Sequence, residues 1–281
     1  MPRSRAFKQV DVFAGRSFGG NPVAVVFDAD DVSTDEMQRF ANWTNLSETT
    51  FVVSPTMPEA DYRVRIFAPD RELPFAGHPT LGTCHAWLES GGVPADADTV
   101  VQECGVGLVA VRVGLEELAF AAPPMIKSGP VSGSELADAV MALGIDPTDV
   151  VASQWIDNGP GWLGILLADA EAVLAVDSVN LNGPCIGIAG MYPPGSEYAY
   201  EVRGFFPDGS VTIEDAVTGS LNASMAQWLI GENRVSAPYR VRQGTALGRF
   251  GVISISHTDT DTVWVGGATV TCIDATVQIS H

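Results

Sequence analysis

Most of the chain consists of short runs of two kinds. In some, apolar and polar positions alternate, and in others apolar residues cluster. Both kinds of run predict β-strands. We predict strands at residues 7–13, 21–27, 51–53, 61–68, 100–102, 107–113, 118–120, 162–167, 185–189, 198–206, 240–242, 251–256, 262–265 and 270–273. Apolar positions recur at helical spacing in fewer stretches. These predict helices at residues 33–45, 79–90, 132–141 and 220–230. Mixed strands with few helices indicate an α+β fold.

The ends of the predicted helices carry typical start and stop residues. Ser33 and Glu36 form the Ser-x-x-Glu pattern of a capping box. Pro79 suits the first turn of its helix, because the first N–H groups of a helix have no partner within it. Gly144 and Gly231 follow the last apolar positions of two helices, where glycine commonly ends a helix.

One segment of the chain returns in altered form. The run FAPDRELPFAGHPTLGTCHAWL, residues 67–88, is followed about 138 residues later by FFPDGSVTIEDAVTGSLNASMAQWL. Aligned with a slip of one residue, His78 falls on Asp215 and Gly82 on Gly219. The repeat predicts a duplicated fold in which two equivalent loops line one cleft with different polar side chains.

The duplication and the length of 281 residues together predict two lobes. The segment AAPPM and the Gly, Pro and Ser residues after it are typical of a connector. We therefore expect an N-terminal lobe at residues 1–127 and a C-terminal lobe at residues 128–281, with the last strands free to cross back to the first lobe.

Composition narrows the classes of partner. The chain has 34 acidic against 15 basic residues and a formal charge of −19, which repels a phosphate backbone, so we expect no nucleic-acid partner. No apolar run approaches the ~18 residues of a membrane span, and the basic start MPRSRAFKQ leads into a strand-like segment. We expect a cytoplasmic protein without a membrane partner.

The four cysteines are widely scattered without a Cys-x-x-Cys pair, which favours buried free thiols over a zinc knuckle or a redox couple. His78, Cys84 and His85 lie close in sequence, but no further residue completes a recognisable ligand set. We expect no metal site.

Both repeat segments place a small polar loop, GHPT and TGS, at the start of a helix. Helix N-termini present unpaired N–H groups that bind carboxylates, so this pattern favours a small anionic substrate. The alternative is a tight turn with no ligand. His78 can exchange a proton near neutral pH and Asp215 can orient or protonate a polar group, although a structural histidine is the alternative for His78 alone.

Glu48 follows Ser47 and precedes two threonines and an apolar strand. Such a junction residue is held firmly and is partly removed from water, as a general base requires. The alternative is an ordinary solvated surface carboxylate.

The segments GNPVAVVF, NLSETTFV, RIFAPDRELPFAGHPTLGT, EDAVTGS and QGTALGR, in this order, resemble the phenazine-biosynthesis PhzF-like isomerase family across nearly the whole chain. The resemblance implies a diaminopimelate-epimerase-like fold of two pseudo-symmetric lobes, each with a strongly bent mixed sheet around a central helix. It also implies an active site between the lobes and a homodimer.

The resemblance further implies roles for individual residues. Glu48 is the expected acid/base, and His78 and Asp215 complete the expected catalytic set. Substrate-binding positions implied in the same way are Ser47, Gly77, Thr80, Gly219 and Ser220. The family commonly has proline after the aspartate, and Ala216 departs from that pattern, which leaves the loop of Asp215 less constrained.

Related racemases use two cysteines, but the corresponding loops here have Ala76 and Ala216 without a thiol. The sequence therefore favours a cofactor-free isomerase, needing no metal, flavin or nicotinamide. It would shift a proton and a double bond in a small conjugated cyclic amino acid or carboxylate of secondary or antibiotic biosynthesis. The resemblance implies a substrate similar to trans-2,3-dihydro-3-hydroxyanthranilate or to an alkylproline precursor, and the sequence does not choose between them. The alternatives are a two-base epimerase or racemase and a non-catalytic ligand-binding homologue.

Overall fold

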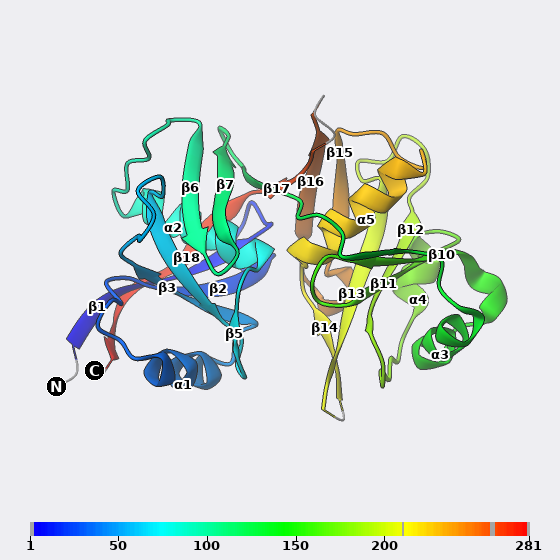
Figure 1. Cartoon of the computed structure of the whole chain (residues 1–281). Coiled ribbons are helices and arrows are strands. Elements are labelled where there is room, and N and C mark those ends of the chain that lie inside the picture. Colours follow the sequence, from blue (N-terminus) through cyan, green and yellow to red (C-terminus); the bar gives the residue numbers. More distant parts are fainter. Residues whose placement is uncertain (1–2, 210, 259–261, 280–281) are drawn as a thin grey trace. The chain divides into compact units, whose positions relative to one another are not determined.

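A computed structural model describes residues 3–209, 211–258 and 262–279 (Figure 1). The chain forms two compact units. Unit 1 comprises the residues up to Ala121 together with those from Gly266 onward, and unit 2 comprises Ala122–Val265. Each unit is a mixed sheet with few helices, which confirms the predicted α+β class.

Unit 1 is a bent sheet around one helix. Its elements are β1 (Arg3–Val12), β2 (Asn21–Val26), α1 (Thr34–Thr44), β3 (Glu48–Val53), β4 (Tyr62–Phe67), β5 (Glu72–Leu73), α2 (Gly77–Glu89), β6 (Thr99–Cys104), β7 (Gly107–Val113), β8 (Leu118–Ala121) and β18 (Thr269–Ile279). The strands pair in the order β18–β1–β2–β3–β4–β6–β7–β8, and β5 adds a short hairpin to β4. Pairs β2–β3 and β4–β6 are parallel.

Unit 2 repeats the same succession. Its elements are β9 (Lys127–Gly129), α3 (Gly133–Leu143), a 3₁₀ turn (Pro147–Asp149), β10 (Val150–Asp157), β11 (Trp162–Leu167), α4 (Ala170–Ala175), β12 (Cys185–Met191), β13 (Tyr200–Asp208), β14 (Val211–Asp215), α5 (Gly219–Gly231), β15 (Tyr239–Gln243), a 3₁₀ turn (Thr245–Leu247) and β16 (Gly251–His257). Strand β17 (Val263–Gly267) spans the end of the unit. The pairs β11–β12 and β13–β15 are parallel, as are their counterparts in unit 1.

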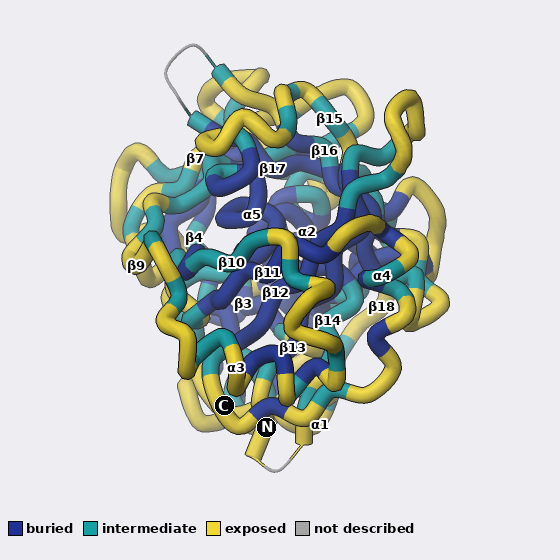
Figure 2. The backbone as a smooth tube through the Cα atoms, turned by 90° about the vertical axis from the view of Figure 1, so that its right-hand side faces the viewer, coloured by how far each residue is buried: buried dark blue, intermediate teal, exposed yellow. Residues whose placement is uncertain are grey.

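Each sheet encloses a helix that is buried along most of its length, α2 in unit 1 and α5 in unit 2 (Figure 2). Small residues allow this close packing. A Cβ at Gly82 of α2 would lie 2.3 Å from Cγ1 of Val23, and one at Gly187 would lie 2.2 Å from Cδ1 of Leu221. The glycines therefore let helix and sheet approach more closely than any side chain would.

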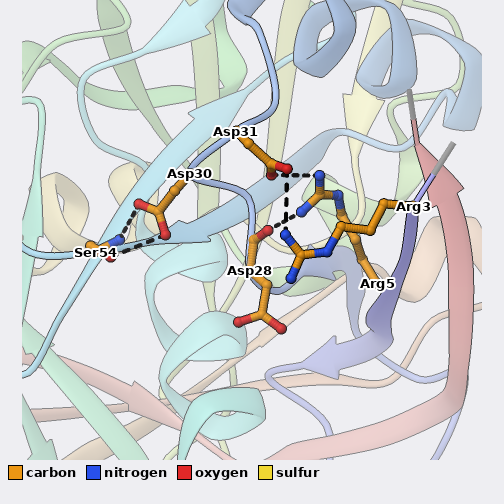
Figure 3. Close-up of polar contacts among 6 residues, drawn as sticks. All are labelled: Arg3, Arg5, Asp28, Asp30, Asp31 and Ser54. Atoms are coloured by element: carbon orange, nitrogen blue, oxygen red, sulfur yellow. Dashed lines mark hydrogen bonds and ion pairs between the residues drawn. The ribbon is translucent and has the colours of Figure 1, made fainter. Parts of the chain in front are cut away.

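A polar cluster anchors the segment that leads into α1 (Figure 3). The buried Arg5 of β1 donates to Oδ1 of Asp31 at 2.6 Å and to the carbonyl of Asp28. Asp30 accepts from the backbone N–H of Ser54 at 2.8 Å and from its hydroxyl at 3.0 Å. These contacts tie β1 and the end of β3 to one loop, and so fix the entry to α1.

The capping box predicted at Ser33 forms only in part. Ser33 accepts a hydrogen bond from the backbone N–H of Glu36 at 3.3 Å, but the Glu36 carboxylate binds Arg39 rather than closing a capping box. The complete box lies at α3, where Ser132 and Glu135 bind each other's backbone N–H groups. The helix predicted at residues 79–90 begins two residues earlier, at Gly77.

The duplication appears as matching hairpins. In β4–β5, Arg65 binds both carboxylate oxygens of Glu72, each at 2.7 Å. In β13–β14, Arg203 binds Glu214 in the same two-pronged way, at 2.9 and 2.8 Å. Strand register agrees, since Glu72 pairs with Phe67 and Glu214 with Phe205.

The predicted match of His78 with Asp215 is wrong. The second hairpin is four residues longer, because 214 − 205 is 9 whereas 72 − 67 is 5. Beyond it, the last strand residues Leu73 and Asp215 correspond, each four positions before the first helical residue, Gly77 or Gly219. His78 therefore corresponds to Ser220.

No helix in the described part of the chain is both long and apolar enough to cross a membrane. All four cysteines are free, and Cys84, Cys104 and Cys185 are buried as predicted, while Cys272 is half-buried. Burial raises the pKa of the Cys84 thiol to about 12, so this thiol stays protonated at neutral pH.

Candidate active site

Glu48 lies four positions after the end of α1, at the predicted junction, and is the first residue of β3, which begins three residues before the predicted strand. It pairs in parallel register with Val23 of β2, while the next two residues, Thr49 and Thr50, are fully buried. Its side chain is 17% exposed. The carboxylate is thus fixed by a central strand of unit 1 and is largely removed from water.

The structure brings Glu48 together with His78. Oε2 of Glu48 lies 3.3 Å from Nε2 of His78, and the imidazole side chain is 5% exposed. On the other side of the ring, Nδ2 of Asn21 lies 3.5 Å from Nδ1. Asn21 opens β2 and His78 is the second residue of α2, so three elements of unit 1 converge on this pair.

The imidazole of His78 is neutral at physiological pH. Burial lowers its pKa to about 3, and a backbone hydrogen bond with Pro22 only partly opposes this effect. The contact with Glu48 is therefore not an ion pair near neutral pH. A neutral imidazole has one N–H donor and one acceptor nitrogen, so while its N–H is directed to the carbonyl of Pro22 the other nitrogen is an acceptor.

The helices that begin at the two repeat loops differ from the others at their N-termini. A side chain caps each of α1, α3 and α4, whereas neither Ala76 at α2 nor Thr218 at α5 makes a side-chain cap bond. Neither helix has an acidic residue in its first turn. Their first N–H groups, including those of Gly77 and Gly219, thus suit an anionic group.

In unit 2, Asp215 is the last residue of β14 and is half-buried. Its Oδ2 accepts a hydrogen bond of 2.8 Å from the hydroxyl of Thr218, which precedes α5. The hydroxyl of Ser220, in the first turn of α5, accepts from the indole N–H of Trp162 at 3.1 Å. The side chains of Asp215 and Ser220 are therefore each held by a neighbouring side chain.

The remaining predicted binding residues have different environments. Ser47 is exposed in the turn before β3. Thr80 is fully buried, and its hydroxyl accepts from Nε2 of Gln102 at 3.0 Å. Gly77 and Gly219 are the first residues of α2 and α5.

Equivalent positions of the two units carry different side chains. Because Thr49 and Ile186 pair with Phe67 and Phe205 respectively, Glu48 of unit 1 corresponds to Cys185 of unit 2. The helix caps Ala76 and Thr218 correspond, so Ala216 is not the counterpart of Ala76, and neither cap is a thiol. Each unit therefore supplies its own set of polar side chains.

Sequence reasoning missed Thr218 and Gln243 as individual residues. Gln243 is fully buried at the end of β15 and makes four side-chain hydrogen bonds to the segment from Asp215 to Asn222. Gln243 begins the block QGTALGR, which indicates the family. The block does not indicate that the Gln243 side chain binds the segment from Asp215 to Asn222.

Among the described residues, no group of three or more His, Cys, Asp or Glu side chains is arranged to hold a metal ion. Two surface hollows of unit 1, of about 330 and 390 Å³, are lined by neither Glu48 nor His78. The candidate site is therefore defined by its side chains and helix ends.

The fold is that of PhzF-family proteins. A family model described as phenazine biosynthesis-like protein, PhzC-PhzF, matches residues 10–275. The chain belongs to this family.

Individual relatives agree with this assignment. The protein named antisense-enhancing sequence 1 of Schizosaccharomyces pombe is 38% identical, with 95% of this chain and 97% of that protein covered. The trans-2,3-dihydro-3-hydroxyanthranilate isomerase of Pseudomonas aeruginosa is 34% identical, with 85% and 86% covered. A PhzF-family structure from Bacillus anthracis shares the fold with a TM-score of 0.84 at 21% identity, with 98% and 99% covered.

Proposed function

We propose that this protein moves a proton, and with it a double bond, within a small conjugated cyclic amino acid or related carboxylate. Family membership makes the protein an isomerase. The name of the Pseudomonas aeruginosa relative supports a substrate similar to trans-2,3-dihydro-3-hydroxyanthranilate, and an alkylproline precursor is the second substrate class. A homodimer in the cytoplasm, acting in antibiotic biosynthesis, completes the proposal.

One observation carries the proposal: Oε2 of Glu48 lies 3.3 Å from Nε2 of a neutral, buried His78. A general base needs a fixed position, limited contact with water and a partner that tolerates both of its protonation states. The β3 backbone supplies the position and burial limits the water. The imidazole accepts from the carboxylic acid while its N–H is directed to Pro22, and it donates to the carboxylate in the other tautomer.

The chemistry would proceed without a cofactor. The Glu48 carboxylate removes a proton from a ring carbon next to a double bond, and the electron pair spreads over the conjugated system and the substrate carboxylate. The uncapped N-terminus of α2, in the same unit as Glu48, suits such negative charge. Glu48 then returns the proton to another carbon, so that no electron, atom or proton is lost.

The decisive experiment compares Glu48→Gln with the wild-type protein in heavy water, with candidate cyclic amino acids as substrates. The glutamine keeps the size of the side chain but cannot take up the proton. We expect loss of deuterium incorporation into the ring with retained ligand binding. The exposed Glu59→Gln is the matched control and should exchange at the wild-type rate. Retained exchange in Glu48→Gln would refute the role of Glu48.

The products distinguish the alternatives. Inversion of a stereocentre without a shift of the double bond would indicate a two-base epimerase, with Asp215 as a candidate second acid. Tight ligand binding by the wild-type protein without any solvent exchange would indicate a non-catalytic homologue.

A further inference from the structure

A buried network in unit 2 connects Gln243 to Asp215. Oε1 of Gln243 accepts from the backbone N–H of Thr218 at 3.0 Å and from Nδ2 of Asn222 at 2.7 Å. Nε2 of Gln243 donates to the carbonyl of Asp215 at 3.3 Å and to the hydroxyl of Thr218 at 3.0 Å. The Thr218 hydroxyl lies 2.8 Å from Oδ2 of Asp215. We call these contacts the Gln243 network.

Two backbone groups fix the direction of every hydrogen bond in this network. The N–H of Thr218 can only donate, so the atom of Gln243 that it contacts is the amide oxygen. The carbonyl of Asp215 can only accept, so the atom beside it is the amide nitrogen. Since that nitrogen also donates to the Thr218 hydroxyl, the hydroxyl proton is left for Oδ2 of Asp215. This oxygen is therefore held as an acceptor.

Unit 1 shows that the fold does not need these side chains. The position matching Asp215 is Leu73, and the position matching Thr218 is Ala76. Arg63 of β4 and Glu201 of β13 occupy equivalent positions. In the parallel strand register Arg63 lies opposite Glu103, and Glu201 lies opposite Arg242. The residues that follow, Cys104 and Gln243, therefore also correspond.

Three of the four members of the network, Asp215, Thr218 and Gln243, are thus replaced in unit 1 by side chains that cannot form it. Unit 1 nevertheless builds a hairpin, four residues shorter, and after it an equivalent buried helix. The network is therefore not needed to form the segment between hairpin and helix, and its role is to hold the side chain of Asp215.

The segment after Gln243 holds the same loop sterically. Gly244 has a φ of +88°, and a Cβ there would lie 2.7 Å from the carbonyl oxygen of Ala216 and 2.8 Å from Cβ of Arg249. This packing constrains the loop at the position where the family commonly has proline.

We propose that Gln243, acting through Thr218, is a positioning residue that holds the Asp215 carboxylate as a hydrogen-bond acceptor for a donor group of the substrate. The inference rests on the proposed function and on the expectation, implied by the family resemblance, that Asp215 binds the substrate. It adds that the group bound by Asp215 is an amine or hydroxyl, because an unprotonated carboxylate would repel a second carboxylate.

The test uses Thr218→Val in the full-length protein. Valine keeps the shape and the backbone N–H bond to Gln243 but lacks the hydroxyl. We expect kcat/KM at neutral pH to fall about tenfold, the effect of one lost charge-assisted hydrogen bond, and the acidic limb of its pH profile to move to higher pH. Thr218→Ser keeps the hydroxyl, so its kcat/KM and its pH profile should both match those of the wild type. Ser224→Ala, which removes a buried hydroxyl of α5 that does not contact Asp215, should match the wild type.

A second measurement needs no substrate. The ¹³C signal of the Asp215 carboxyl carbon, followed by NMR as a function of pH, should titrate at higher pH in Thr218→Val than in the wild type or Ser224→Ala. If Thr218→Val does not fold, Gln243→Glu replaces it, since the new side chain accepts the same bonds but cannot donate to Thr218. An unchanged titration would overturn the proposal. A shifted titration with no turnover of any cyclic acid would support the network while refuting the proposed function.

Discussion

Arg203 holds Glu214 with two parallel hydrogen bonds, and the same guanidinium also donates to the carbonyls of Val173 and Val176 at the end of α4. Its counterpart in the repeat, Arg65, holds Glu72 in the same way but donates in addition only to the hydroxyl of Thr34, within the described contacts. The side chains of the second pair are 6% and 13% exposed, against 22% and 40% in the first.

Arg203→Met should therefore destabilise the protein by about 3–5 kcal/mol, because a buried carboxylate and two carbonyls lose their donor. Arg65→Met should cost about 1 kcal/mol, since water reaches Glu72. Urea denaturation of both variants measures the difference. Equal losses would show that burial does not distinguish the two pairs.

The stability of the protein should fall in acid partly through His78. Its pKa is lowered from 6.5 to about 3, so the unfolded chain binds a proton in this range that the native state does not. The contribution is complete above about pH 6.5 and is lost as the pH falls towards 3, with a size on the order of a few kcal/mol.

Replacing His78 by Gln should remove that part of the pH dependence. Chemical denaturation of wild type and His78→Gln between pH 7 and pH 4 measures it. An identical slope for His78→Gln would show that His78 is not kept neutral by burial.

The close approach of α2 to the sheet predicts a steric effect. In Gly82→Ala the new Cβ would lie 2.3 Å from Cγ1 of Val23, a fully buried and stiff side chain. We expect a loss of about 1–3 kcal/mol in thermal or urea unfolding. Gly133→Ala, at the first residue of α3 with no atom within 4 Å, should change stability by less than about 0.5 kcal/mol.

Catalysis should depend on the reach of Glu48. Glu48→Asp keeps the charge but withdraws the carboxylate by one methylene, so solvent exchange into the substrate should slow about 100-fold if Glu48 is the base. The exposed Glu116→Asp should retain the wild-type rate. Full activity in Glu48→Asp would argue against direct proton transfer by this residue.

Local patterns predicted most elements because each strand or helix carries its own periodicity. Strand 162–167 and strand 107–113 have the predicted bounds. By contrast, β10 and the six-residue α4 were missed. In β10 the polar residues Ser153 and Gln154 interrupt the apolar run, and α4 is too short for a helical period to appear.

The sequence by itself determined the β-rich class, the duplication, the family motifs and the junction that presents Glu48, because these depend on residue types close together along the chain. Only the tertiary structure decided which positions correspond. Because the hairpin of unit 2 is four residues longer, Asp215 corresponds to Leu73 and not to His78. The strand register shows this correspondence, whereas the spacing of residues along the sequence does not. The fold also decided that His78 is neutral and that Gln243 orients Asp215, since burial and contacts between distant segments arise only when the sheet closes around its helix.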